Sequence, residues 1–168
     1  MTHSALLQLL TEFAADRLTL LLRHEAGARV VAHYDFNNAY QYVISREETH
    51  VAWLQSALAE RGAGLPPACA AIDVPDGPKA GGRVDPASDH AILEDDARHL
   101  ASFVERWRPR VAVMTQARHR IMLNVVLGET LEHQRLFQQA ASGFEDLLGR
   151  RTGGVARTGG VLPTRWVE

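Results

Sequence analysis

Two long stretches in the N-terminal half place hydrophobic residues at steps of three and four, the spacing of an amphipathic helix. The first stretch covers residues 4–33, and the second covers residues 38–61 and stops at Gly62. Asp35 and two asparagines mark a short turn between them. Because the connection is short, we expect the two helices to pack side by side and antiparallel.

Two further stretches with helical spacing occupy the C-terminal half. One begins at Pro86, directly after an aspartate that can cap it, and runs to about residue 107. The other begins at Pro109 or after Thr115 and runs to about residue 148, with Gly128 as the point where a short fifth segment would separate. No stretch shows the strict alternation that a strand requires. The pattern therefore predicts an all-α fold, an up-down four-helix bundle.

The segment between the second and third helices is long. Residues 63–85 lack a helical period and contain four prolines and several glycines. A connection of this length can cross the bundle from end to end and start the third helix parallel to the second. We therefore predict a crossover within one domain over residues 1–149, followed by an extended C-terminal tail over residues 150–168.

Composition narrows the class of protein. The 168 residues are 46% hydrophobic with a net charge of -2, which suits one soluble domain with a full core. No basic excess points to nucleic acid, and no apolar stretch has membrane-spanning length. Cys69 is the single cysteine, which excludes an intramolecular disulfide and a cysteine metal cluster. Together with an N-terminus that lacks a signal-peptide pattern, these features predict a cytoplasmic protein.

Two polar residues interrupt the apolar face of the second helix. Glu47 and His50 lie one turn apart and point the same way. A carboxylate and an imidazole aimed at a core cost several kcal/mol unless they are paired or bound to a metal. Glu25 lies in the apolar line of the first helix, eleven residues before Phe36 (36 − 25), and Glu47 lies eleven after it (47 − 36). We therefore expect the two carboxylates to meet at one height across the helix pair.

Acids and histidines also fall on the inner faces of the last two helices. Asp96 stands in the apolar line of the third helix, three residues before His99. Glu129 and His133 share a face of the fourth helix, with Glu132 beside them. Such residues are either paired with each other and with arginines, or they are ligands of a metal ion inside the bundle.

The sequence Glu47-x-x-His50, in a bundle with a short first turn and a long crossover, resembles the ferritin-like superfamily, in particular its rubrerythrin-like small bundles. The resemblance implies one or two ions of iron or manganese, and an oxidoreductase or a protein that handles peroxide or iron. The metal ligands that it implies are Glu25, Glu47, His50, Asp96, Glu129 and His133, with Glu132 and His99 as alternates.

Two alternatives stand beside this interpretation, and the sequence leaves open whether the protein is an enzyme. His50 together with Glu129-x-x-x-His133 is also similar to DinB-type four-helix proteins, which implies a single metal ion with open positions. The other alternative is a metal-free structural or interaction bundle in which every inward acid is paired with histidine or arginine. Because soluble bundles commonly associate, we expect a homodimer, and we expect no nucleic acid or membrane partner.

Overall fold

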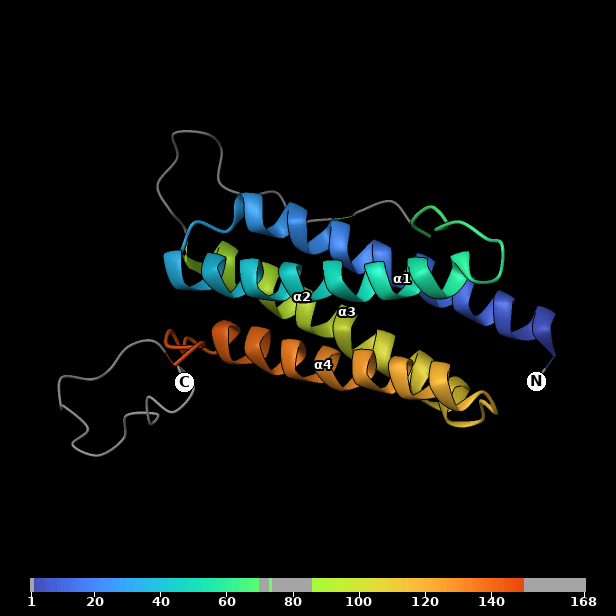
Figure 1. Ribbon diagram of the computed structural model, residues 1–168. Coiled ribbons are helices and arrows are strands. Elements are labelled where there is room, and N and C mark those ends of the chain that lie inside the picture. Colours follow the sequence, from blue (N-terminus) through green and yellow to red (C-terminus); the bar gives the residue numbers. More distant parts are fainter. Residues whose placement is uncertain (1, 70–72, 74–85, 150–168) are drawn as a thin grey trace, which may run out of the picture.

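The computed structural model describes residues 2–69, 73 and 86–149, and these form a bundle of four long helices (Figure 1). In chain order the helices are α1 (His3–Val30), α2 (Tyr34–Ala59), α3 (Pro86–Ala112) and α4 (Ala117–Ala141). The described part of the chain contains no strand. The predicted all-α four-helix bundle is therefore confirmed.

The helices pack as two antiparallel pairs, α1 with α2 and α3 with α4 (Figure 1). The second pair lies against the first so that α3 faces α1 and α4 faces α2. As a result α2 and α3 run in the same direction, which the predicted crossover requires. Most of the crossover, at residues 70–72 and 74–85, and the predicted tail at residues 150–168 lie outside the described residues.

Thr2 caps the start of α1 by accepting a hydrogen bond from an amide in its first turn.

The link between α1 and α2 is held in place by a residue of a third helix, α3. At the other end of α1, Asp89 of α3 accepts the backbone amides of Ala32 and His33 over 3.4 and 3.0 Å. These contacts hold a link shorter than predicted, and α2 begins at Tyr34 instead of residue 38.

α3 and α4 begin where the sequence predicts, but their C-terminal ends differ from the prediction. Pro109 lies inside α3, which continues to Ala112, because the buried residues Trp107 and Val111 anchor that turn and offset the hydrogen bond that a proline removes. α4 passes through Gly128 without a break, so there is no separate fifth segment there. It ends at Ala141, well before residue 148.

Aromatic rings pack together in the core toward the end of the bundle where α1 begins and α3 ends. Phe13 lies edge to face with Phe103 and Trp107, at ring-centroid distances of 5.1 and 4.9 Å. The middle of the bundle is different, because charged and polar side chains are buried there. They are Arg17, Arg23, His24, Glu47, His50, Asp96, Thr130 and His133.

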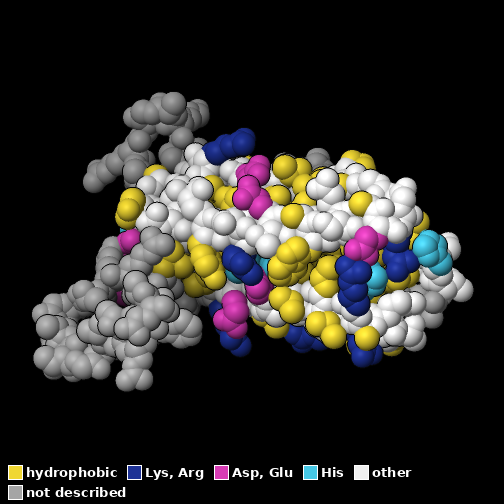
Figure 2. Space-filling view, in the orientation of Figure 1, with side chains coloured by type: hydrophobic (Ala, Val, Ile, Leu, Met, Phe, Trp, Pro, Cys, Tyr) yellow, Lys and Arg dark blue, Asp and Glu magenta, His cyan; other side chains and the backbone are white. Residues whose placement is uncertain are grey.

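The outer surface is mixed in character. Figure 2 shows charged side chains of both signs spread among hydrophobic ones on one face of the molecule. Within the described residues, no helix combines the length and the apolar character needed to cross a membrane. The feature that distinguishes this bundle is the group of charged and polar side chains buried in its middle.

Candidate functional site

One buried arginine joins the inner faces of α1, α2 and α4. Arg17 of α1 is 0% exposed, and its guanidinium reaches both other helices. Nη1 donates a hydrogen bond to the hydroxyl of Thr130, and Nη2 donates one to Nδ1 of His50, each over 3.1 Å. Nη2 also lies 2.9 Å from Oε1 of Glu47, close enough for an ion pair although the angle is not that of a hydrogen bond. We call Arg17, these partners and the residues that contact the partners in turn the core cluster; the additional members are His24, Arg46, Glu129 and His133.

Glu47 has a second partner in the core cluster. Nδ1 of His24 lies 2.8 Å from Oε2 of Glu47, and since a carboxylate only accepts, this nitrogen carries the proton. Burial by itself raises the pKa of Glu47, but the opposing effects of Arg17 and His24 outweigh it and lower the pKa to about 2. Glu47 is therefore ionised at neutral pH, with Arg17 as its counterion.

The tautomer of His50 follows from its two neighbours. A guanidinium has no acceptor, so Nδ1 of His50 must accept from Arg17. Nε2 lies 3.0 Å from Oε2 of Glu129 and donates to it. Burial, followed by the charge of Arg17, lowers the pKa of His50 to about 4. His50 is therefore neutral at pH 7, and a second proton on Nδ1 would point at the guanidinium.

Glu129 closes the core cluster at its outer edge. Arg46 of α2 donates two hydrogen bonds to its carboxylate, from Nε over 2.9 Å and from Nη2 over 2.6 Å. This bidentate pair, aided by His50, lowers the pKa of Glu129. Two arginines and two glutamates thus balance one another's charge across the core cluster.

Two imidazole nitrogens of the core cluster lack a hydrogen-bond partner among the described residues, Nε2 of His24 and Nδ1 of His133. The ring of His133 is 1% exposed and stacks on His50 at 25° and a centroid distance of 6.4 Å. Burial is the main cause that lowers the pKa of His133 to about 3. His133 is therefore neutral at pH 7, and one ring nitrogen is unused.

Asp96 lies outside the core cluster in a second buried network. Nε of Arg23 donates to its Oδ1 over 2.5 Å, and the hydroxyl of Tyr40 donates to its Oδ2. Burial and the charge of Asp96 raise the pKa of Tyr40 well above its usual value. Asp95, next in the chain, also pairs with Arg23. Asp96 is thus the acceptor of an arginine and a tyrosine, on the α1 and α2 sides of α3.

Glu25 does not take the position opposite Glu47 that we expected. The height along the bundle was right, but His24 makes the contact, and Glu25 is partly exposed. A shift of one residue rotates the direction of a helical side chain by about 100°. The alternates also point outward: Glu132 is exposed and pairs with Arg135, and His99 is exposed.

The core cluster as it stands does not fit a metal ion. Of the six predicted ligands, Glu47, His50, Glu129 and His133 lie around Arg17, while the other two lie elsewhere. A metal ion would have to enter where the guanidinium already contacts Glu47 and His50. It would also add at least two positive charges to a buried group whose charges are balanced, and such burial of net charge is costly.

Arg17 and Thr130 are among the residues that the sequence interpretation missed. Counting the first helix one residue out of phase hid the line of Phe13, Arg17 and His24, which has the same helical spacing. On α4, Thr130-x-x-His133 repeats the spacing of Glu47-x-x-His50 with a threonine in place of the acid. Both patterns can be found in the sequence, but arginine and threonine are not residue types that usually bind metal ions.

The fold and the core cluster define a four-helix bundle with a charge-balanced, arginine-centred interior. No protein-family model matches the chain, and no curated protein matches its sequence. A similar solved structure is the crystal structure of a conserved hypothetical protein, rv2844, from Mycobacterium tuberculosis. The TM-score is 0.65 at 15% sequence identity, over 83% of this chain and 99% of that chain. At this identity the likeness shows the fold alone.

Proposed function

We propose that this protein is a relative of the ferritin-like bundles whose core has lost its metal, and that it acts as a structural or interaction module without enzymatic activity. One observation carries the proposal: each predicted inward acid that the structure places in the interior is paired with a cation or a hydrogen-bond donor of the chain itself. The pairs are Glu47 with Arg17 and His24, Asp96 with Arg23 and Tyr40, and Glu129 with Arg46 and His50.

The chemistry of Arg17 supports this reading of the core. A guanidinium supplies a permanent positive charge and hydrogen-bond donors to the oxygen and nitrogen atoms around it. It has no coordination position for oxygen or peroxide, and it does not change oxidation state. An arginine at this place therefore gives the bundle a stable polar interior without redox chemistry.

Metal analysis of the purified protein tests the proposal. The protein is made in medium supplemented with iron and manganese, and its metal content is compared with that of His50→Ala and of Glu132→Ala, an exposed acid of α4 that serves as the control. We expect no metal that the His50 substitution removes. We also expect chelation to shift the melting temperature of the wild type no more than that of His50→Ala. Stoichiometric metal that is lost in His50→Ala but kept in Glu132→Ala would overturn the proposal.

The second candidate function is a ferritin-like or DinB-like metalloprotein with iron or manganese in the core. The unused nitrogens of His24 and His133 favour it, because they lie in the same cluster as Glu47 and His50. These four side chains would hold the ion, and Arg17 would have to leave. Bound iron or manganese would supply oxidoreductase chemistry toward oxygen or peroxide. The same metal analysis separates the two candidates.

A further inference from the structure

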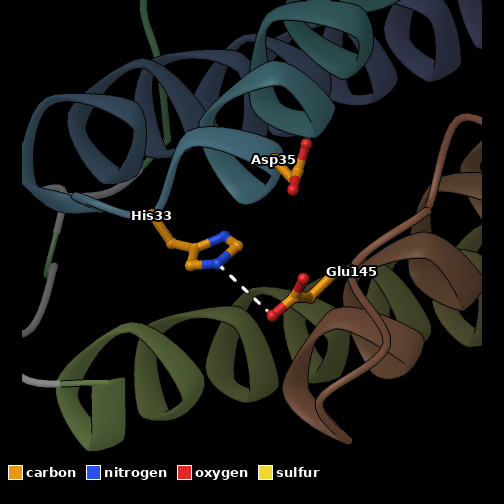
Figure 3. A group of neighbouring side chains, drawn as sticks. All are labelled: His33, Asp35 and Glu145. Carbon is orange, nitrogen blue, oxygen red and sulfur yellow. Dashed lines mark ion pairs between the residues drawn. The ribbon is translucent and has the colours of Figure 1, made fainter. Parts of the chain in front are cut away.

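Three side chains from three segments converge at the end of the bundle where α1 turns into α2 and where α4 ends (Figure 3). His33 lies in the link before α2, Asp35 lies in the first turn of α2, and Glu145 follows α4. Each offers one ligand atom, and the three atoms lie within 4.8 Å of one another. Ligand atoms that share an ion at bonds of about 2.1 Å are roughly 3–3.5 Å apart, so small side-chain movements suffice.

The histidine of this group is oriented by its surroundings. Its ring stacks on Phe36, a buried residue of α2, at a centroid distance of 4.1 Å. The backbone amide of His33 is held by Asp89, over 3.0 Å. A ligand that is fixed before an ion arrives loses less conformational freedom on binding.

The ring nitrogens of His33 make no hydrogen bond within the described part of the chain. Nδ1 is buried without a partner, and Nε2 lies 3.8 Å from Oε1 of Glu145, which is too far for a hydrogen bond. Figure 3 shows the ring beside the two carboxylates, with a dashed line that joins Nε2 to Glu145. With the ring proton on Nδ1, the lone pair of Nε2 is available to an ion that lies among the ring and the two carboxylates.

We propose that His33, Asp35 and Glu145 bind one divalent transition-metal ion, with Zn²⁺ or Mn²⁺ as the best match to one imidazole and two carboxylates. Water fills the remaining coordination positions. The ion joins the segment after α4 to the α1–α2 link, and so it stabilises this end of the bundle. The site shares no residue with the core cluster and does not depend on the function proposed for it.

Titration of the whole protein with Zn²⁺ or Mn²⁺ alone, by calorimetry and by thermal melting, tests the site. We expect one ion per chain and a melting temperature that rises with metal concentration. His33→Phe keeps a ring on Phe36 but has no ligand atom, and Glu145→Gln keeps the shape of the acid. Each is expected to weaken binding by at least the roughly 10–100-fold seen when a group behind a metal ligand is removed.

The matched controls are Glu132→Gln, an exposed acid outside the group, and His50→Ala in the core cluster. Both are expected to bind the ion as the wild type does, while circular dichroism checks that every variant folds. The proposal is overturned if the wild type shows no saturable binding, or if His33→Phe and Glu145→Gln bind as tightly as the controls, which would mean an adventitious ion only. Loss of binding in His50→Ala alone would instead contradict the function proposed for the core.

Discussion

Replacing Arg17 by methionine removes the cation of the core cluster while keeping a long side chain in its place. Glu47 then stays buried with only His24 as a partner. The pKa of Glu47 is about 2 against a usual value of 4.5, which corresponds to roughly 3 kcal/mol at 1.36 kcal/mol per pKa unit. Removing one partner of a buried ion pair costs about 3–5 kcal/mol. We therefore expect Arg17→Met to lower the free energy of unfolding at pH 7 by about 3–5 kcal/mol.

A second substitution separates the charge effect from a packing effect. Arg17→Met combined with Glu47→Met removes both charges, and hydrophobic replacement of a whole buried pair is often neutral or stabilising. We expect the double variant to recover more than half of the loss. The hydrogen bonds to His50 and Thr130 are not recovered, so full recovery is not expected.

The pH dependence gives an independent check with a fixed sign. Because the folded-state pKa of Glu47 is lowered, its contribution in the wild type is present above pH 4.5 and is lost as the pH falls toward 2. Without Arg17 the pKa of Glu47 rises, so this carboxylate is protonated at a higher pH in Arg17→Met than in the wild type. The difference in stability between the wild type and Arg17→Met should therefore narrow as the pH falls from 7 to 4.

Urea denaturation followed by circular dichroism at 222 nm measures these free energies, and a constant dependence on urea shows that the unfolded states are comparable. A loss below 1 kcal/mol for Arg17→Met at pH 7 would refute the ion-pair account. So would a double variant that is less stable than the single one.

Three further predictions concern acid stability, glycine positions and association. Burial lowers the pKa values of His50 and His133 to about 4 and about 3, so the unfolded state takes up protons at a higher pH than the folded state. The free energy of unfolding should therefore fall as the pH drops from 6.5 toward 3. Urea titrations should show a shallower dependence on pH for His133→Gln than for the wild type. Gly27→Ala should destabilise, because its methyl group would lie 3.0 Å from the hydroxyl of buried Tyr40, whereas Gly128→Ala meets nothing within 4 Å and should raise the melting point through about 1 kcal/mol of helix propensity. The expected homodimer is checked by sedimentation velocity, where a strict monomer at high micromolar concentration would contradict it.

The four-helix fold could be predicted from the sequence because hydrophobic spacing and turn residues act locally. Helix ends were less accurate, because Asp89 of α3 fixes the α1–α2 link from a distance in sequence, and because packing of Trp107 carries α3 past Pro109. Periodicity alone did not reveal these tertiary contacts.

The candidate site could be predicted in part. Glu47 and His50 were recognised as inward residues, and both lie in the core cluster. Their partners were not recognised, because a one-residue error in phase turns Glu25 inward in place of His24 and moves Arg17 off the apolar line. A search for ligand residues also passes over an arginine, although its charge decides what the acids around it can do.

The pairing of the two helical hairpins has a consequence for how the chain folds. α1 with α2 and α3 with α4 make mostly local contacts, so each hairpin is suited to form early. When the hairpins dock, two buried arginines of the first hairpin form hydrogen bonds to the second. Arg17 donates to Thr130, and Arg23 donates to Asp96. Docking shifted by one helical turn would separate Arg23 from Asp95 and Asp96, and it would remove the hydrogen bond of Arg17 to Thr130. A buried charge that loses its partner costs several kcal/mol. These contacts therefore select a single register from the several that apolar faces alone would allow.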